Sequence, residues 1–260
     1  MASLLEAPSI ATYRHGDFDP ARLAVLKGGA TVTACIPARD EAATIGAIVG
    51  TIRRELGAKG AGLVDEILVV DDASSDGTGR VARREGATVI AGPGYGKGQA
   101  MGLACRRADI VVFLDGDVAN FGAHFVTGLL GPLLTSPQTV LVKGAYERPV
   151  AGDPNGGGRV TELVAKPLLS LLFPELSGVS QPLAGETALR RRVLEDLELA
   201  PGYGVEIGLL IDVAERYGAD AVAQVDLGVR LHRNRPLKEL SSQAREVMQA
   251  ALVRVRPAAP

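Results

Sequence analysis

The sequence predicts an α/β protein built on a mostly parallel, doubly wound sheet. Short apolar segments alternate along the chain with segments whose apolar residues recur at helical spacing. The apolar segments are continuous and do not alternate with polar residues, which is typical of strands that are covered on both faces. Two of them run directly into acidic residues. Crossover connections between parallel strands are expected to be right-handed.

Composition favours one globular chain and excludes several classes of function. The 260 residues, of which 47% are hydrophobic and 22% charged, suffice for one sizeable core or a core with a subdomain. A net charge of -2 argues against a general nucleic-acid binder or a basic membrane-surface protein, because both need an excess of Lys and Arg. The two cysteines give no disulfide framework, and no apolar run reaches the ~18 residues of a transmembrane helix. We therefore expect a cytoplasmic protein that binds neither nucleic acid nor membrane.

The first half of the chain is expected to alternate strands with helices. It begins with an N-terminal tail, residues 1–29, to which no structure is assigned. The expected strands are residues 31–37, 66–70, 88–91 and 110–117. The expected helices are residues 42–56, a helix that contains Val81 and Ala82 and ends at Gly86, and residues 99–107. Residues 30–146 are therefore expected to form one α/β half.

The parallel pattern stops in the second half, residues 147–260, which is expected to continue the same fold. Residues 148–159 contain two prolines and four glycines, which is typical of a mobile loop over a site. The helix over residues 160–173 is expected to be interrupted near Pro167. The remaining expectations are helices over residues 125–134, 190–197, 205–217 and 239–255, and strands over residues 139–146, 183–187 and 221–231.

The strand over residues 110–117 ends in Asp115, Gly116 and Asp117. Ligands of open α/β sheets gather at the carboxyl ends of the strands. Two carboxylates one residue apart can hold a hard divalent cation, and Gly116 allows the backbone to turn so that both point outward. The alternative is a solvated acidic turn, because Asp and Gly are common turn residues.

This acidic turn is one of several motifs along the chain. They are residues 37–38 with 40–41, Asp71, and residues 96–98, 115–117, 156–165, 181–183, 200–210 and 232–236. With these motifs the chain resembles, nearly end to end, the glucosyl-3-phosphoglycerate synthases and the related mannosyl-3-phosphoglycerate synthases, which are nucleotide-sugar-dependent transferases of the GT-A fold. The last three motifs are specific to these enzymes. The chain departs from the family at Gly116, where serine is common, at Asp72 and Ala73, where Ser-Gly is common, and in a shorter loop before Lys97.

The resemblance implies a metal-dependent, retaining transfer of a hexose, glucose from UDP-glucose, to 3-phosphoglycerate, by a homodimer. Mannose transfer from GDP-mannose and a non-catalytic nucleotide-sugar-binding protein remain alternatives. A divalent cation, Mg²⁺ or Mn²⁺, neutralises the charge of a departing diphosphate, and Asp115 and Asp117 are placed to hold it. His232 resembles the third metal ligand of the family. The alternative for His232 is an ordinary surface residue.

The donor is expected to bind in the half formed by residues 30–146. The expected donor-binding residues are Pro37, Ala38, Glu41, Asp72, Lys97, Asp115 and Gly116. Lys97 adds a cation that can reach the diphosphate, whereas carboxylates at strand ends can accept hydrogen bonds from a base and a ribose. The alternative for Glu41 and Asp72 is a structural role at a helix start, the role we assign to Asp76.

The acceptor is expected to bind in the half formed by residues 147–260, at Gly158, Arg159, Thr161 and Asn234. Free amides at a helix start, with a guanidinium beside them, suit a phosphate. The alternative is a flexible loop before an ordinary Thr-capped helix. Asp117 and Glu206 are the expected catalytic residues, with Glu206 either accepting a sugar hydroxyl, as the resemblance implies, or pairing with a nearby Arg. No nucleophile is assigned, so transfer in which the leaving phosphate takes the acceptor proton stays open.

Two other enzyme classes share parts of this pattern. A nucleotide-dependent dehydrogenase would have the same kind of sheet, but no G-x-G-x-x-G follows the first strand. A phosphatase with an aspartyl nucleophile is suggested by the acidic turn alone.

Overall fold

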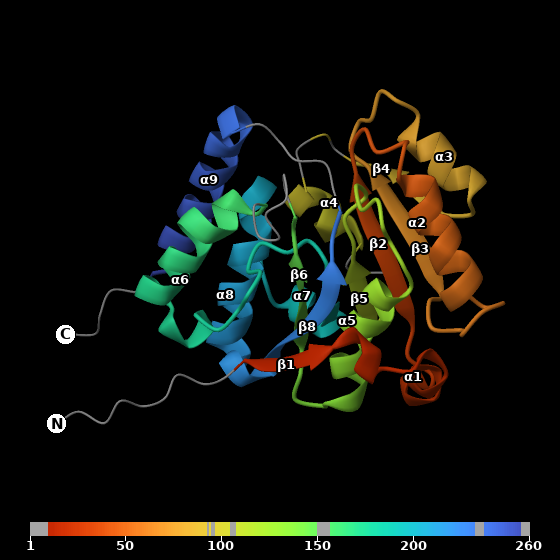
Figure 1. The fold of residues 1–260 in the computed structure, drawn as a ribbon, viewed down its shortest axis with the longest axis horizontal. Helices are drawn as coiled ribbons and strands as arrows, with labels where there is room; N and C mark the ends of the chain where they lie inside the picture. The colour runs from red at the N-terminus through yellow and green to blue at the C-terminus, as the bar shows by residue number, and fades with distance from the viewer. Residues whose placement is uncertain are drawn as a thin grey trace.

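The structure is a computed structural model that describes residues 10–92, 94, 97–104, 108–149, 157–231 and 237–255. Its strands form one sheet in the order β1-β8-β6-β7-β5-β2-β3-β4 (Figure 1). The strands of the described residues are β1 (Ala11–Arg14), β2 (Val32–Ala38), β3 (Glu66–Asp71), β4 (Thr88–Ala91), β5 (Ile110–Phe113), β6 (Leu141–Glu147), β7 (Thr187–Arg190) and β8 (Val222–Val229). Neighbouring strands are parallel except at β7, which runs antiparallel to β5 and β6. The predicted mostly parallel sheet is therefore confirmed.

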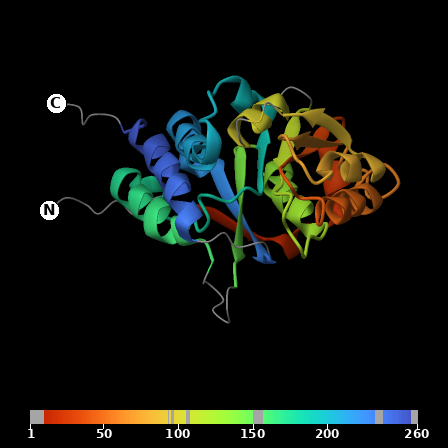
Figure 2. The same cartoon turned by 90° about the horizontal axis from the view of Figure 1, so that it is seen from above.

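Helices cover both faces of this sheet. The helices of the described residues are α1 (Pro20–Lys27), α2 (Ile45–Thr51), α3 (Thr78–Arg84), α4 (Lys97–Ala104), α5 (His124–Thr135), α6 (Lys166–Leu172), α7 (Arg191–Glu195), α8 (Val205–Tyr217) and α9 (Leu237–Leu252). One core cluster contains side chains of α1, α2, α3 and α5, and a second contains side chains of α4, α6, α8 and α9. Figure 2 separates the two groups, with α6 (green) and α9 (blue) on the left and α2 and α3 (orange) on the right.

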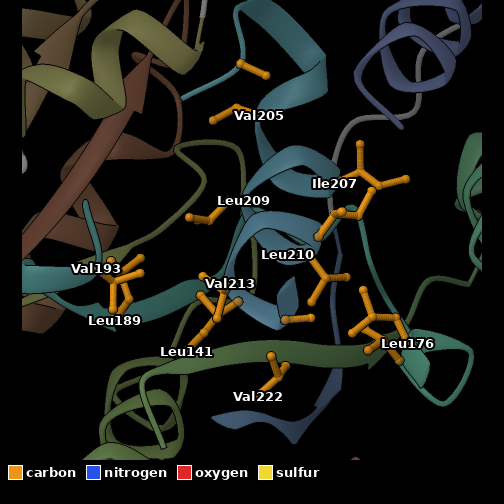
Figure 3. Close-up of a cluster of buried hydrophobic side chains, with 14 of the residues drawn as sticks. Leu141, Leu176, Leu189, Val193, Val205, Ile207, Leu209, Leu210, Val213 and Val222 are labelled. Carbon is orange, nitrogen blue, oxygen red and sulfur yellow. The ribbon is translucent and has the colours of Figure 1, made fainter. Parts of the chain in front are cut away.

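Each central strand contributes side chains to both core clusters. In β2, Ala34 and Ile36 belong to the cluster with α2, whereas Cys35 belongs to the cluster with α8. Figure 3 shows the cluster with α8, where the helix lies over strand residues such as Leu141 and Val222. The continuous apolar strands are thus buried on both faces, as the sequence predicts.

The described part of the expected N-terminal tail, to which the sequence analysis assigned no structure, contains a strand and a helix. β1 pairs in parallel with β8, from Ala11 beside Ala223 to Arg14 beside Asp226. α1 follows, and the backbone N–H of Arg22 donates to the Asp19 carboxylate at 2.8 Å. An Asp cap followed by Pro20 is a helix-start signal, so the sequence did contain evidence for α1.

The structure of the second half adds to or corrects the expected elements in three places. β7 begins at Thr187, the residue where a strand was expected to end. The interruption expected near Pro167 takes the form of a change in helix type, because a π-helical turn, Thr161–Ala165, leads into α6 at Lys166. The last helix, α9, begins and ends two or three residues earlier than the expected range of residues 239–255. In the part of the chain that the structure describes, no helix has the length and apolar character needed to cross a membrane.

The sheet has a topological switch point between β2 and β5. β2, β3 and β4 follow one another outward, and β5 then lies on the other side of β2. Crevices at such points, outside the carboxyl ends of the strands, are where open α/β sheets bind ligands. The fold therefore places the acidic turn after β5 at the expected position for a site.

Candidate active site

One edge of the sheet gathers the carboxyl ends of β2, β5, β6 and β8 and the start of β7. β5 and β6 are both antiparallel to β7, so they are parallel to each other, and β8 and β2 share their direction. Asp115 and Asp117 follow β5, Arg148 follows β6 and Arg230 follows β8. Glu186 immediately precedes β7. Charged residues that are far apart in the sequence therefore meet at this edge.

Asp115 and Asp117 share one guanidinium. Nη2 of Arg230 lies 2.7 Å from Oδ2 of Asp115 and 2.8 Å from Oδ1 of Asp117. Nε of the same side chain lies 2.9 Å from Oε1 of Glu186, whose side chain is completely buried. Arg230 is only 3% exposed. Three carboxylates are thus arranged around one buried arginine.

The charges around Asp115 and Asp117 affect the two carboxyl groups differently. Burial acts to raise the pKa of Asp115, but the charges of Lys97 and Arg230 outweigh it and hold that pKa below its ordinary value. Burial raises the pKa of Asp117, together with the charges of Asp115 and Glu186, and Arg230 does not cancel this effect. Asp115 is therefore the stronger acid of the two.

Lys97, the first residue of α4, connects the acidic turn to α8. Its Nζ lies 2.5 Å from Oδ1 of Asp115 and 2.8 Å from Oε1 of Glu206, which is in the first turn of α8. Burial acts to lower the pKa of Lys97, but Asp115 and Glu206 outweigh it and hold that pKa well above its ordinary value. Lys97 therefore stays charged. Among the ion pairs of the described residues, the partner of Glu206 is this lysine.

The backbone before β7 passes close to this ion pair. A Cβ added to Gly185 would overlap Oδ1 of Asp115 and Nζ of Lys97, so a side chain there would displace this ion pair. Lys143, a β6 residue that is 1% exposed, holds the same segment, because its Nζ donates to the Ala184 carbonyl at 2.6 Å and to Oγ1 of Thr187 at 3.0 Å. Burial lowers the pKa of Lys143 to about 8.

The expected donor-binding residues lie at the ends of β2 and β3 and beside the acidic turn. Pro37 and Ala38 end β2 and pair with Val70 and Asp71 of β3. Gly116 packs against this corner, since an added Cβ would lie 3.3 Å from Cγ of Glu41 and 3.5 Å from Cβ of Ala38.

The acidic residues after β3 have different surroundings. Asp72 is buried, and its carboxylate accepts a hydrogen bond from the backbone N–H of Gly94 at 2.7 Å. The Asp76 carboxylate accepts from the backbone N–H groups of Ala42 and Thr78, both at 2.9 Å, which confirms its structural role at the helix start. Asp72 stays a predicted donor-binding residue, whereas the Asp76 carboxylate is bound to backbone groups of the protein itself.

On the expected acceptor side, Gly158 has a φ of 73°, which favours glycine, and it directly precedes Arg159. Thr161 is buried. An added Cβ at Gly158 would lie 3.6 Å from Nη1 of Arg148, so Arg148 is beside the start of this helix. The structure therefore brings Arg148 into a position for which the sequence analysis named no residue.

Arg148 also links this side to the acidic turn. Its Nη2 donates to the Tyr146 hydroxyl at 2.9 Å, and that hydroxyl donates to Oε2 of Glu186 at 2.7 Å. The guanidinium carbons of Arg148 and Arg230 lie 4.9 Å and 5.4 Å from the centre of the Tyr146 ring. Burial raises the pKa of the Tyr146 hydroxyl, as does the charge of Glu186, so the hydroxyl stays protonated.

His232 and Asn234 lie outside the described residues, as do residues 150–156 of the expected loop. Among the described residues, no group of three or more His, Cys, Asp or Glu side chains can hold a metal ion. Asp115 and Asp117 nevertheless fit a divalent cation, because carboxylate oxygens are hard ligands and the pair already accommodates the positive charge of Arg230.

The sequence analysis missed Arg230, Glu186, Tyr146 and Arg148. A signal existed for Glu186, because a charged residue inside a buried apolar segment needs a partner. Nothing in the local sequence identifies Arg230 as that partner, since 44 positions separate the two residues.

Comparisons with known proteins agree with this arrangement. The family model described as Glycosyl transferase family 2 matches residues 33–197. The chain is 49% identical to the glucosyl-3-phosphoglycerate synthase of Mycolicibacterium smegmatis, over 94% of this chain and 84% of that protein.

Two solved structures have the same fold. The glucosyl-3-phosphoglycerate synthase from Mycobacterium tuberculosis, in complex with Mn²⁺, UDP-glucose and phosphoglyceric acid, matches with a TM-score of 0.86 at 43% identity, covering 96% of this chain and 89% of that chain. It has also been solved with Mg²⁺ and UDP. The mannosyl-3-phosphoglycerate synthase from Rubrobacter xylanophilus matches with a TM-score of 0.88 at 40% identity, covering 96% of this chain and 85% of that chain. The expected GT-A fold is confirmed.

Proposed function

Because the chain belongs to the glucosyl-3-phosphoglycerate synthases, within glycosyl transferase family 2, we propose that it transfers glucose from UDP-glucose to 3-phosphoglycerate, giving glucosyl-3-phosphoglycerate. The observation that carries this proposal is the convergence of Lys97, Asp115 and Glu206 at the switch point of the sheet. The fold thus supplies a cation and carboxylates where a nucleotide sugar would lie. Neither the dehydrogenase nor the aspartyl phosphatase is consistent with this family.

The proposed metal ligands are Asp115, Asp117 and His232, and the metal is Mg²⁺ or Mn²⁺. When bound, the cation neutralises the charge that develops on the departing diphosphate. Asp117, which is partly exposed and lies beyond the end of β5, can turn toward the ion without disturbing the core.

The proposed donor site consists of Pro37, Ala38, Glu41, Asp72, Lys97, Asp115 and Gly116. Lys97 is held by two carboxylates before any substrate arrives, so its charge is already oriented toward the donor side. Glu206 is oriented by the same lysine, and its role is to accept a hydrogen bond from a hydroxyl of the transferred sugar.

The proposed acceptor site consists of Gly158, Arg159, Thr161 and Asn234. The left-handed backbone at Gly158 directs the following amides, and Arg159 supplies a positive charge beside them. These groups would hold the phosphate of 3-phosphoglycerate.

The transfer forms a bond between the acceptor hydroxyl oxygen and the anomeric carbon and breaks the bond from that carbon to the diphosphate oxygen. We assign no enzyme nucleophile, and in our proposal the departing diphosphate takes the acceptor proton, with retention of configuration. The contribution of the protein is to orient both substrates and to hold fixed charges near the leaving group.

The proposed organisation places the donor in the half formed by residues 30–146 and the acceptor in residues 147–260. A cytoplasmic homodimer is also proposed. Ala244, Met248 and Leu252 line a groove on α9, and the latter two are exposed, so this face can bind a second copy. Light scattering that gives the mass of a single chain would contradict the dimer.

Mannose transfer is the second candidate, because the mannosyl-3-phosphoglycerate synthase of Rubrobacter xylanophilus has the same fold at 40% identity. The test is a panel of UDP-glucose, GDP-glucose, UDP-mannose and GDP-mannose with 3-phosphoglycerate and Mg²⁺ or Mn²⁺, with each product identified by mass. We expect the highest rate with UDP-glucose. A higher rate with GDP-mannose would reverse the donor assignment, and no product with any donor would reject transfer to this acceptor.

A further inference from the structure

We propose that, in the metal-free protein, the Arg230 guanidinium occupies the two carboxylates that are proposed to bind the metal. Metal binding is then an exchange of the guanidinium for the divalent ion. This inference rests on the proposed metal-dependent transfer and concerns the same two carboxylates, Asp115 and Asp117. Arg230 would hold these two carboxylates in position until a metal ion displaces its guanidinium.

One nitrogen of Arg230 contacts both Asp115 and Asp117. Nη2 of Arg230 donates to Oδ2 of Asp115 at 2.7 Å and to Oδ1 of Asp117 at 2.8 Å. It therefore bridges the carboxylates in the way that a metal ion bridges its ligands. A cation that takes these two oxygens must remove Nη2 from at least one of them.

Lys97 does not occupy the carboxylate oxygens that Arg230 occupies. Lys97 binds Oδ1 of Asp115, the oxygen that Arg230 leaves free, and it is also held by Glu206. Among the ion pairs of the described residues, Arg230 is the only cation on Asp117. The competition at Asp117 is therefore specific to Arg230.

Arg230 keeps an ion-pair partner after the exchange. Its Nε is paired with the buried Glu186 at 2.9 Å, and its guanidinium lies 5.4 Å from the centre of the Tyr146 ring. Release of Nη2 leaves this ion pair in place, so neither Arg230 nor Glu186 becomes an unpaired buried charge. The exchange can therefore occur without unfolding of the site.

In the free protein, the arginine also prevents repulsion. Without it, Asp115, Asp117 and Glu186 would face one another with less positive charge among them, and like charges at short range destabilise each other. A neutral side chain at position 230 should therefore leave a site that binds a divalent cation more tightly and is less stable without one.

The test is the affinity for Mn²⁺ alone, measured without nucleotide from the electron paramagnetic resonance signal of free Mn²⁺. The variants are Arg230→Met, which removes the competing charge, and Arg148→Met, which removes the same charge from the other arginine at the Tyr146 ring. Arg148 is the matched control because its guanidinium donates to the Tyr146 hydroxyl, and among the described residues it forms no ion pair with Asp115 or Asp117.

We expect Arg230→Met to bind Mn²⁺ about tenfold more tightly than the wild type, or more, which corresponds to at least about 1.4 kcal/mol of competition. Arg148→Met should change the affinity much less. Unchanged or weaker binding by Arg230→Met would overturn the exchange while leaving the metal site itself intact. If the wild type and both variants bind no Mn²⁺ at these carboxylates, the proposed metal site is rejected together with the exchange.

A second measurement uses the wild type and does not depend on the folding of a variant. The side-chain N–H signals of Arg230, assigned by their loss in Arg230→Lys, are followed by nuclear magnetic resonance during addition of Mg²⁺ without nucleotide. The internal control is Arg254, which is held by both oxygens of Asp212 at 2.7 Å. The exchange predicts that the Arg230 signals move and those of Arg254 do not. Static Arg230 signals at saturating Mg²⁺ would overturn it.

Discussion

Arg159 is the residue on which the acceptor assignment depends most. It follows Gly158, whose φ of 73° turns the chain into the helix, and it is partly buried. A guanidinium in this position can form charge-assisted hydrogen bonds to a phosphate. If it does, the affinity for 3-phosphoglycerate depends on Arg159, whereas the affinity for the nucleotide sugar does not.

Arg159→Ala is therefore expected to raise the KM for 3-phosphoglycerate by about tenfold to hundredfold, because losing a charged hydrogen bond costs roughly 1.5–3 kcal/mol. The KM for the nucleotide sugar should stay nearly constant. Lys166→Ala is the control, since Lys166 is a cation on the same helical segment that pairs with Glu162 at 2.6 Å. Steady-state kinetics with each substrate varied in turn provide both values. Equal increases in both KM values would mean that Arg159 orders the segment and does not bind the acceptor.

Ala73 has a φ of 62° in the turn after β3, a conformation that glycine adopts at lower cost. Ala73→Gly is expected to increase the free energy of unfolding by about 0.5–1 kcal/mol, because the strain exceeds the added entropy of an unfolded glycine. The control is Ala24→Gly within α1, where the same change should lower the free energy of unfolding by about 1 kcal/mol. Urea unfolding of both variants measures the two signs. A loss of stability in Ala73→Gly would show that the turn is not strained.

At the level of elements, the segment before β7 fixes the position of the ion pair between α4 and α8. Lys97 starts α4 and pairs with Glu206 in the first turn of α8, and Gly185 lies so close to Lys97 and Asp115 that a Cβ there would overlap both side chains. The position of Lys97 therefore depends partly on the absence of a side chain at position 185.

Gly185→Ala is expected to lower turnover by about 10²-fold, because the added methyl group would displace Asp115 and Lys97 by a large fraction of an ångström. The matched control is Gly102→Ala in α4, where nothing lies within 4 Å of an added Cβ. That variant should keep its turnover and gain about 0.5–1 kcal/mol of stability. Wild-type turnover in Gly185→Ala would mean that the ion pair does not need this geometry.

Lys143 gives the same segment a dependence on pH. Its folded pKa of about 8 lies below the ordinary lysine value of 10.5, so between these values the unfolded chain binds more protons than the folded one. The contribution of Lys143 to stability is therefore unfavourable below pH 8 and improves as the pH rises toward 10.5.

The free energy of unfolding of the wild type, relative to Lys143→Met, is expected to rise by roughly 2 kcal/mol between pH 7 and pH 10. Urea unfolding of both proteins at several pH values measures this difference. The comparison removes the titration of all other groups. A difference that stays constant or falls with pH would show that Lys143 is charged in the fold over the whole range.

At the scale of the whole molecule, the sequence predicts what is local. The buried strands, most helices and the acidic turn at residues 115–117 follow from periodicity and from residue types at strand ends. β1 could not be predicted in this way, because it is short and mostly exposed and exists through its pairing with β8, more than 200 positions away.

The same reason limits prediction of the site. Asp115 and Asp117 are neighbours in the sequence, but their partner Arg230 is 115 and 113 positions away. That pairing depends on the order of strands in the sheet, which places the ends of β5 and β8 at the same edge. Glu186 reaches that edge only because β7 runs antiparallel to its neighbours. Local patterns therefore identify ligands of a site more readily than they identify the charges that neutralise them.

The two ends of β5 carry carboxylates with different surroundings. Asp117 lies beyond the carboxyl end of β5, at the proposed active site, whereas Asp109 precedes the amino end of the same strand and binds the backbone and hydroxyl of Thr31 at 2.9 Å. Both are carboxylates next to β5, and only their edge differs. Substitution of each should therefore separate function from structure.

The most direct test is the rate of glucosyl-3-phosphoglycerate formation from UDP-glucose by Asp117→Ala, with Asp109→Ala as the matched control. We expect Asp117→Ala to remain folded and to lose about 10²-fold or more of the rate, because it loses a transition-state electrostatic contribution. Asp109→Ala should lose some stability and keep a rate close to that of the wild type. A rate near the wild-type value in Asp117→Ala, above all in the presence of EDTA, would contradict the assignment of the acidic turn as the active centre.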